Sequence, residues 1–140
     1  MIILDTDCLS LMNRDQILVA SKLQKALDEI DSEQIYTSII SFEEQMRGWL
    51  AFIAKCKTAH DQIFAYARLH ISLESYRNTQ VLDFDEKAVA VFEQLKSQKV
   101  RIGTMDLKIA SIAIANHAIL VSRNLADFER VPGLAIQDWT

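Results

Sequence analysis

The sequence predicts a single α/β domain over residues 1–140, with a parallel central sheet flanked by helices. Short apolar, β-branched segments alternate with longer segments whose apolar residues recur at helical spacing. The strand segments are almost continuously apolar, as is typical of parallel strands buried on both faces. With one proline and three isolated glycines, the chain contains no stretch that resembles a linker.

The expected elements follow one another along the chain as strands and helices. A buried strand covers residues 2–5, and a short helix at 8–13 follows it, with Asp7 or Ser10 as its cap. A helical pattern spans 15–30, and residues 36–40 are β-branched and aromatic, which predicts the second strand. The remaining expected elements are helices at 41–55, 58–76, 86–98 and 105–117, strands at 81–84, 118–122 and 134–137, and a turn at 124–129.

Composition narrows the class of protein. Half of the residues are hydrophobic and 24% are charged, which fits a compact globule and excludes a disordered chain. No apolar run is long enough to span a membrane, and the first residues lack the basic region of a signal peptide. Two cysteines form neither a disulfide framework nor a zinc spacing, so we expect a cytoplasmic protein. The net charge of −4 argues mildly against avid, non-specific binding to nucleic acid.

Four acidic residues lie at the ends of expected strands or the starts of expected helices. Asp5 closes the first strand, Glu44 follows the second, Asp106 opens the most apolar helix and Asp127 follows the strand at 118–122. The carboxyl ends of parallel strands meet at one edge, where α/β folds keep their active sites. Carboxylates gathered there repel one another unless a hard cation such as Mg²⁺ or Mn²⁺ neutralises them. The sequence therefore predicts a metal-dependent enzyme that acts on a phosphodiester.

The first two of these positions also have structural interpretations. Asp5 or Asp7 can cap the helix that follows, although a carboxylate at the lip of the core needs a partner. Ser41 and Glu44 have the spacing of a capping box, with Ser41 as the N-cap and Glu44 at the third helical position. For Glu44 alone, this structural role is favoured over a catalytic one.

The other two positions leave comparable alternatives open. Asp106 in the first turn of a helix can simply stabilise the helix dipole. Asp127 lies in a polar segment after a strand, where a surface turn is the alternative and Asn124 is a second possible oxygen donor. Each acid is weak support by itself, and the argument depends on all four meeting at one edge.

Two other classes of α/β protein fit less well. A phosphatase with an aspartyl nucleophile also begins with a strand followed by Asp-x-Asp, but the segment at 8–10 lacks the required continuation. A receiver domain needs an acceptor aspartate after its third strand. Asp83 and Asp85 lie near that place, but the spacing of acids elsewhere does not fit.

Three motifs resemble a PIN domain: LDTD at 4–7, TSIISFEEQMRG at 37–48 and MDLKIA at 105–110. The segment LVSRNLADFERVPGL at 120–134 is similar to the VapC branch, the ribonuclease toxins of toxin–antitoxin pairs. The resemblance implies that Asp5, Glu44 and Asp106 match the three core metal-binding acids of the family. Glu44 is the match rather than Glu43 because the family glutamate lies four residues before a glycine, here Gly48.

The resemblance gives less exact assignments elsewhere. The fourth acid varies in place within the family, so Asp127 is our choice and Asn124 the reserve. Asp7 stands where the family more often has asparagine, and it can add a ligand or keep a polar role. The hydroxyls of Thr6 and Ser41 are expected to orient ligands or water from behind the acids.

The resemblance implies a Mg²⁺- or Mn²⁺-dependent endoribonuclease toxin that acts on RNA, forms a homodimer and is neutralised by a cognate antitoxin. A catalytically silent PIN-like module that binds RNA or protein is the alternative. The uncharged side chains of Leu9, Leu11 and Met12 suggest one surface for the antitoxin, an apolar groove on the first helices.

Overall fold

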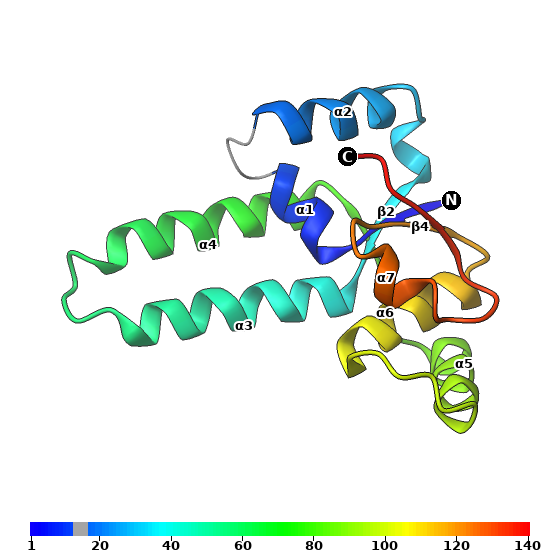
Figure 1. The fold of residues 1–140 in the computed structure, drawn as a ribbon. Helices are drawn as coiled ribbons and strands as arrows, with labels where there is room; N and C mark the ends of the chain where they lie inside the picture. Colours follow the sequence, from blue (N-terminus) through cyan, green and yellow to red (C-terminus); the bar gives the residue numbers. More distant parts are fainter. Residues whose placement is uncertain (13–16) are drawn as a thin grey trace.

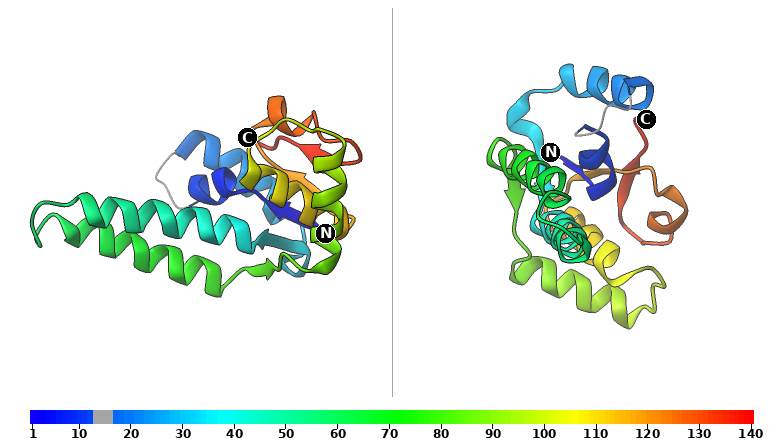
Figure 2. Two further views of the ribbon diagram at one scale, coloured as in Figure 1. Left: turned by 90° about the horizontal axis from the view of Figure 1, so that it is seen from below. Right: turned by 90° about the vertical axis from the view of Figure 1, so that its left-hand side faces the viewer.

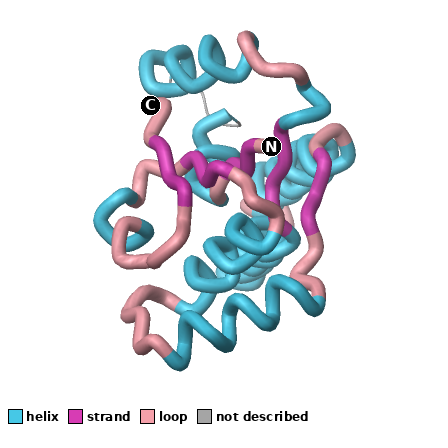
Figure 3. The backbone as a smooth tube through the Cα atoms, turned by 90° about the vertical axis from the view of Figure 1, so that its right-hand side faces the viewer, coloured by secondary structure: helices cyan, strands magenta, loops and turns pink. Residues whose placement is uncertain are grey.

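The computed structural model describes residues 1–12 and 17–140, and its strands form one sheet in the order β3-β2-β1-β4-β5. Every neighbouring pair is parallel, and Figure 3 shows the strands running through the middle of the surrounding helices. The expected α/β class with a parallel central sheet is therefore confirmed. The strands are β1 (Ile2–Leu4), β2 (Ile35–Ser38), β3 (Gln80–Leu82), β4 (Ile119–Val121) and β5 (Ala135–Gln137).

The helices agree with the expected segments apart from their ends. A 3₁₀ helix before β2 was not expected, and the expected turn at 124–129 contains a short helix. Parts of the expected helices at 8–13 and 15–30, namely residues 13, 15 and 16, lie outside the described residues. The helices are α1 (Thr6–Met12), α2 (Ile17–Asp28), the 3₁₀ helix η1 (Ser32–Gln34), α3 (Ile39–Lys55), α4 (Gln62–Arg77), α5 (Glu86–Ser97), α6 (Thr104–Ala115) and α7 (Leu125–Phe128).

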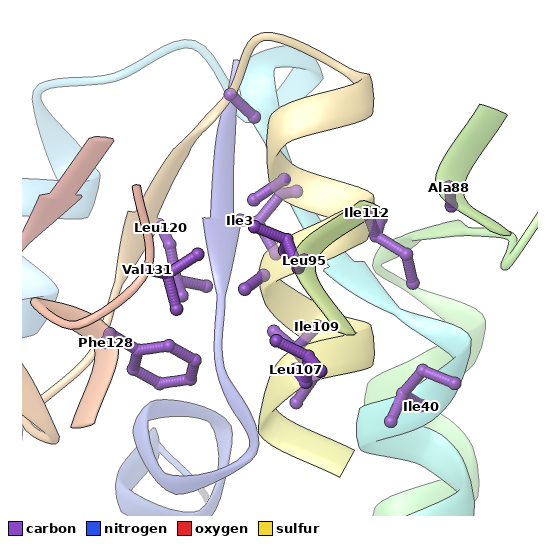
Figure 4. Packing of buried hydrophobic residues seen from close by; sticks show 13 residues of the cluster. Ile3, Ile40, Ala88, Leu95, Leu107, Ile109, Ile112, Leu120, Phe128 and Val131 are labelled. Carbon is purple, nitrogen blue, oxygen red and sulfur yellow. The ribbon is translucent and has the colours of Figure 1, made fainter. Parts of the chain in front are cut away.

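Both faces of the sheet are buried, which explains why its strands are apolar without alternation. Ile3 and Leu120 belong to a core cluster with α5, α6 and α7, part of which Figure 4 shows at close range. Their neighbours Leu4 and Val121 belong to a second cluster, under α1 and α2. Because successive side chains of a strand point to opposite faces, β1 and β4 connect the two layers.

Helix α3 begins earlier than expected, and this changes the interpretation of Glu44. The Oγ atom of Ser38 accepts a hydrogen bond from the backbone N–H of Ser41 at 3.1 Å, so Ser38 is the N-cap and Ser41 lies in the first turn. The expected capping box of Ser41 and Glu44 is therefore wrong. The β-branched pair Ile39 and Ile40 looks like the end of a strand, but Ile40 packs into the core from the first turn of the helix.

Helices α3 and α4 form a long hairpin that projects from the rest of the domain (Figures 1 and 2). Large apolar side chains are exposed along it, including Ile63 at 61% and Phe64 at 58%. The expected apolar groove on the first helices is wrong, because Leu9 and Leu11 are buried and α2 packs on α1. Among the described residues, no helix combines the length and the apolar character that crossing a membrane requires.

Candidate active site

Asp5 is a buried acid held from two sides at the end of β1. One carboxylate oxygen, Oδ1, accepts a hydrogen bond from the backbone N–H of Cys8 at 2.8 Å, so Asp5 caps α1, and of the three expected caps neither Asp7 nor Ser10 has this role. The other oxygen, Oδ2, accepts from the hydroxyl of Ser122. Burial raises the pKa of the Asp5 carboxyl above its ordinary value, and the two hydrogen bonds oppose that effect.

Ser122 reaches Asp5 because of the strand register. Leu4 pairs with Val121 across β1 and β4, so the next residues along these strands, Asp5 and Ser122, are neighbours beyond the end of the pairing. Ser122 is fully buried, and its N–H donates to the carbonyl of Gln137 at 3.0 Å. The sequence analysis missed this residue; its signal is a polar residue directly after a buried strand.

Asp106 lies opposite, in the first turn of α6, and its carboxyl has a pKa raised to about 6. Burial is the largest cause, followed by the negative charges of Glu44, Asp127 and Asp5. Three of the expected acids, from three other parts of the fold, thus lie within electrostatic range of the Asp106 carboxylate. This proximity agrees with a position of the four predicted acids at the carboxyl edge of the parallel sheet.

Asn124 lies between two of these acids. Its side-chain amide donates to Oδ2 of Asp127 at 3.1 Å and, at the limit of a hydrogen bond, to Oδ2 of Asp106 at 3.5 Å. Its own backbone N–H donates to the hydroxyl of Ser122 at 2.9 Å. Asn124 therefore links Ser122, the partner of Asp5, to Asp127 and Asp106, and its amide N–H groups face the carboxylates of these last two residues.

The remaining expected residues divide into two groups. The hydroxyl of Thr6 donates to Oε1 of Glu44 at 2.9 Å, so Thr6 lies directly behind an acid as expected. The hydrogen bonds described for Ser41 are with Ser38, and they belong to the start of α3. Asp7 is paired with Arg123 at 2.7 Å instead, and 56% of its side chain is exposed.

The cluster fits a hard divalent cation in charge and in donor type. Carboxylate oxygens are the ligands that Mg²⁺ and Mn²⁺ prefer. A bound cation would also neutralise the negative charges that repel one another around Asp106. In the part of the chain that the structure describes, no three Asp, Glu, His or Cys side chains are grouped closely enough to hold an ion as they stand.

A groove of about 550 Å³ opens beside Glu44 and runs along the α3–α4 hairpin. Thr6 and Glu44 line its end at the acidic cluster, and the hairpin lines it with apolar and aromatic side chains such as Trp49, Phe52 and Phe64. The groove thus joins the candidate site to the exposed apolar surface of the hairpin.

A family model described as the PIN domain matches residues 2–134. The chain belongs to the PIN-domain family. The resemblance expected from the motifs is confirmed, and the match leaves only a few residues at either end of the chain outside the domain.

Relatives of this PIN domain carry VapC names. Ribonuclease VapC2 of Rickettsia felis is 36% identical over 64 residues, and the tRNA(fMet)-specific endonuclease VapC of Salmonella typhimurium is 38% identical over 64 residues. Each match covers 43% of this chain and 48% of the relative, so the chain spans about half the length of the curated relatives it matches.

A solved structure extends the likeness to the whole fold. The crystal structure of VapBC2 from Rickettsia felis, bound to a DNA fragment from its promoter, aligns with a TM-score of 0.75 at 26% identity. The alignment covers 100% of both chains. The similarity therefore includes the sheet, the hairpin and the segments that carry the four acids.

Proposed function

We propose that this PIN domain is a metal-dependent endoribonuclease of the VapC type and that a cognate antitoxin neutralises it. The observation that carries the proposal is the convergence on Asp106 of Glu44, Asp127 and Asp5, whose negative charges add to the effect of burial in raising the pKa of Asp106 to about 6. Partly buried carboxylates within range of one another repel, and a bound cation is one way to offset that repulsion. The ribonuclease names of the relatives agree with this chemistry.

In this proposal, Asp5 and Asp106 hold the principal cation, Mg²⁺ or Mn²⁺, while Glu44 and Asp127 complete its shell or bridge to a second position. A bound divalent cation supplies activation of water and stabilisation of charge on the phosphate. The chain supplies the orientation of the acids, since Ser122 and the Cys8 N–H fix Asp5 and Thr6 fixes Glu44.

The fourth position has two candidates, Asp127 and Asn124. Asn124 donates to the carboxylates of Asp127 and Asp106, so its amide N–H groups serve these acids rather than a cation. We therefore keep Asp127 as the fourth acid and assign Asn124 the role of orienting it.

The decisive test is cleavage of total cellular RNA by purified, antitoxin-free protein in Mn²⁺, Mg²⁺ or EDTA. Discrete products are expected with either metal and none with EDTA or with the Asp106→Asn variant. Asp83→Asn is the matched control, because Asp83 is an exposed aspartate outside the cluster. Absence of cleavage by folded wild-type protein in both metals would favour the silent binding module instead.

The proposed antitoxin needs a surface, and the α3–α4 hairpin offers an exposed apolar one. An isolated domain rarely exposes a contiguous apolar patch of this kind without a partner. Phe64 and Tyr66 are 58% and 55% exposed on the same helix, but Phe64 lines the groove and Tyr66 is not among its lining residues. We expect Phe64→Asp to abolish co-purification with the co-expressed antitoxin and Tyr66→Asp to preserve it.

The proposed homodimer has a separate test. Light scattering of the purified protein without antitoxin is expected to give twice the mass of 15.9 kDa. A mass that stays at that of one chain over a wide range of concentrations would contradict the dimer and leave the cleavage proposal unaffected.

A further inference from the structure

The side chain of Gln45 connects three helices directly beside the acidic cluster. Its amide Nε2 donates to Oγ of Ser10 on α1 at 3.1 Å, and its carbonyl oxygen accepts from Oγ of Ser72 on α4 at 3.3 Å. Gln45 itself lies on α3, next to Glu44. Both ends of this one amide are therefore used to hold α1 and α4 against α3.

The contacts of Gln45 converge on Thr6. The carbonyl oxygen of Thr6 accepts from Oγ of Ser10 at 2.9 Å and, at the limit of a hydrogen bond, from Nε2 of Gln45 at 3.5 Å. The hydroxyl of Thr6 donates to Glu44 at 2.9 Å, and Thr6 directly follows Asp5. Gln45 thus holds the backbone of the residue that orients one acid and adjoins another.

The surroundings of the Gln45 amide indicate that it orients its hydrogen-bond partners rather than filling space. Gln45 lines the groove together with Trp49, Phe52 and Ile71, where an apolar side chain would pack as well. An amide contributes there only if both of its ends are paired, because an unpaired polar group that loses water is destabilising. Ser72, one of its two serine partners, is buried.

We propose that Gln45 is a positioning residue for the cleavage site, which holds the first turn of α1 so that the Thr6 hydroxyl keeps the Glu44 carboxylate directed toward the other acids. This inference rests on the proposed function and names a residue that the four-acid pattern does not include. The side-chain hydrogen bonds of Gln45 are with Thr6, Ser10 and Ser72 rather than with an acid, so Gln45 acts through Thr6.

The test begins with Gln45→Met, which keeps the length and the helix propensity of the side chain and removes both polar ends. Removing such a supporting contact is expected to lower kcat by about 10- to 30-fold while KM changes less than about twofold. The Mn²⁺ concentration that half-saturates the metal-induced rise in Tm is expected to increase by about threefold or more.

Gln80→Met is the matched control. Gln80 also donates its side-chain amide to a distant segment, to the carbonyl of Glu33 at 3.0 Å, but it lies on β3 at the edge of the sheet. We expect this variant to keep the wild-type kcat and the wild-type response to Mn²⁺. The comparison separates the effect of losing any long-range amide contact from the effect of losing the contacts of Gln45.

A double-mutant cycle distinguishes positioning from general stability. If Gln45 acts through the Thr6 hydroxyl, then Gln45→Met in a Thr6→Val background adds less than about twofold to the loss of kcat. Full additivity of the two losses, or a wild-type kcat and Mn²⁺ response in Gln45→Met, would overturn the proposal. If wild-type protein cuts no RNA, the proposed function fails, and the Mn²⁺-induced rise in Tm alone decides the role of Gln45.

Discussion

The two sides of the acidic cluster are built differently. On the strand side, Asp5 receives two hydrogen bonds: the start of α1 provides the Cys8 N–H, and the strand register places the Ser122 hydroxyl. On the helix side, Asp106 faces one long contact from Asn124 at 3.5 Å and the charges of three other carboxylates. The strand side is therefore organised before any ligand binds, whereas the helix side holds charge that the protein itself does not neutralise.

This difference assigns the two sides separate parts in the proposed reaction. A rigid acid on the strand side fixes where a cation sits. A repelled acid on the helix side gives the cation a larger gain in free energy when it arrives, because binding removes a repulsion that folding left in place. Both sides are then needed for cleavage, but they should respond in opposite ways when stability is measured.

The largest expected effect is on cleavage and is the same on both sides. Asp5→Asn and Asp106→Asn should each lower the rate of RNA cleavage by at least about 10³-fold, because each removes a charged ligand from the proposed cation. Single-turnover rates at saturating Mn²⁺ measure this directly, with Asp83→Asn as the exposed control. Full activity in either variant would remove that acid from the site.

The next effect belongs to the strand side and concerns stability. Ser122→Ala leaves the buried Asp5 carboxylate without one donor and should lower the free energy of unfolding by about 2 kcal/mol at neutral pH. The loss should shrink in acid, since the hydrogen bond from Ser122 lowers the pKa of Asp5 and a protonated carboxyl needs that donor less.

Ser111→Ala is the control for this prediction, and urea unfolding measures the free energy of unfolding of both variants. Ser111 is equally buried, but its hydroxyl donates to the neutral carbonyl of Leu107 within α6 at 2.7 Å. A smaller loss is expected, about 1 kcal/mol or less, because the acceptor carries no charge. Equal losses in the two variants would show that the Asp5 contact has no special strength.

The helix side should show the opposite sign. Asp106→Asn is expected to raise the free energy of unfolding of the metal-free protein by about 1–2 kcal/mol at pH 7.5, after a discount for partial exposure. The Asp106 pKa is raised to about 6 in the folded protein from 3.8, so the folded state is favoured below the lower value and loses that advantage as pH rises through about 6.

The pH dependence makes this prediction specific. The difference between wild type and Asp106→Asn should be absent below about pH 3.8, grow through the window up to about pH 6 and stay constant above it. Urea unfolding at a series of pH values in EDTA measures it. A variant that is less stable than wild type at pH 7.5 would show that the repulsion at Asp106 is already compensated.

The smallest effect is expected at Asp7, outside the cluster. Its ion pair with Arg123 is exposed on both partners, 56% and 39%, and such pairs contribute little. Asp7→Asn should change the free energy of unfolding by less than about 0.5 kcal/mol and leave cleavage within about twofold of wild type. A loss of cleavage above tenfold would make Asp7 a ligand after all.

The convergence of the acids was predictable because parallel strands place their carboxyl ends at one edge, whatever the details of the loops. The partners of the acids were not predictable in the same way. Ser122 reaches Asp5 only through the register of β1 on β4, and a shift of one residue would have placed a different side chain there. The position of an acid relative to its strand places it at this edge of the sheet, whereas the pairing of distant segments determines which side chains donate hydrogen bonds to it.

Two errors have local causes. The N-cap of α3 was placed three residues too late because Ser38 and Ser41 are both acceptable caps and Ile39 and Ile40 favour a strand by themselves. The apolar face of α1 was mistaken for an open groove because the sequence does not show that α2 covers it, burying Leu9. In both cases packing against another element decided between local alternatives.

The hydrogen bond from Ser122 to Asp5 joins positions 117 residues apart, and this has a consequence for the time at which the site exists. During synthesis β1 and the α3–α4 hairpin leave the ribosome before β4 and the residues that follow it. Contacts between such distant segments form only after both are available. A growing chain therefore contains its apolar hairpin before it has an assembled acidic site, so a partner that binds the hairpin can meet the protein before the proposed cleavage site exists.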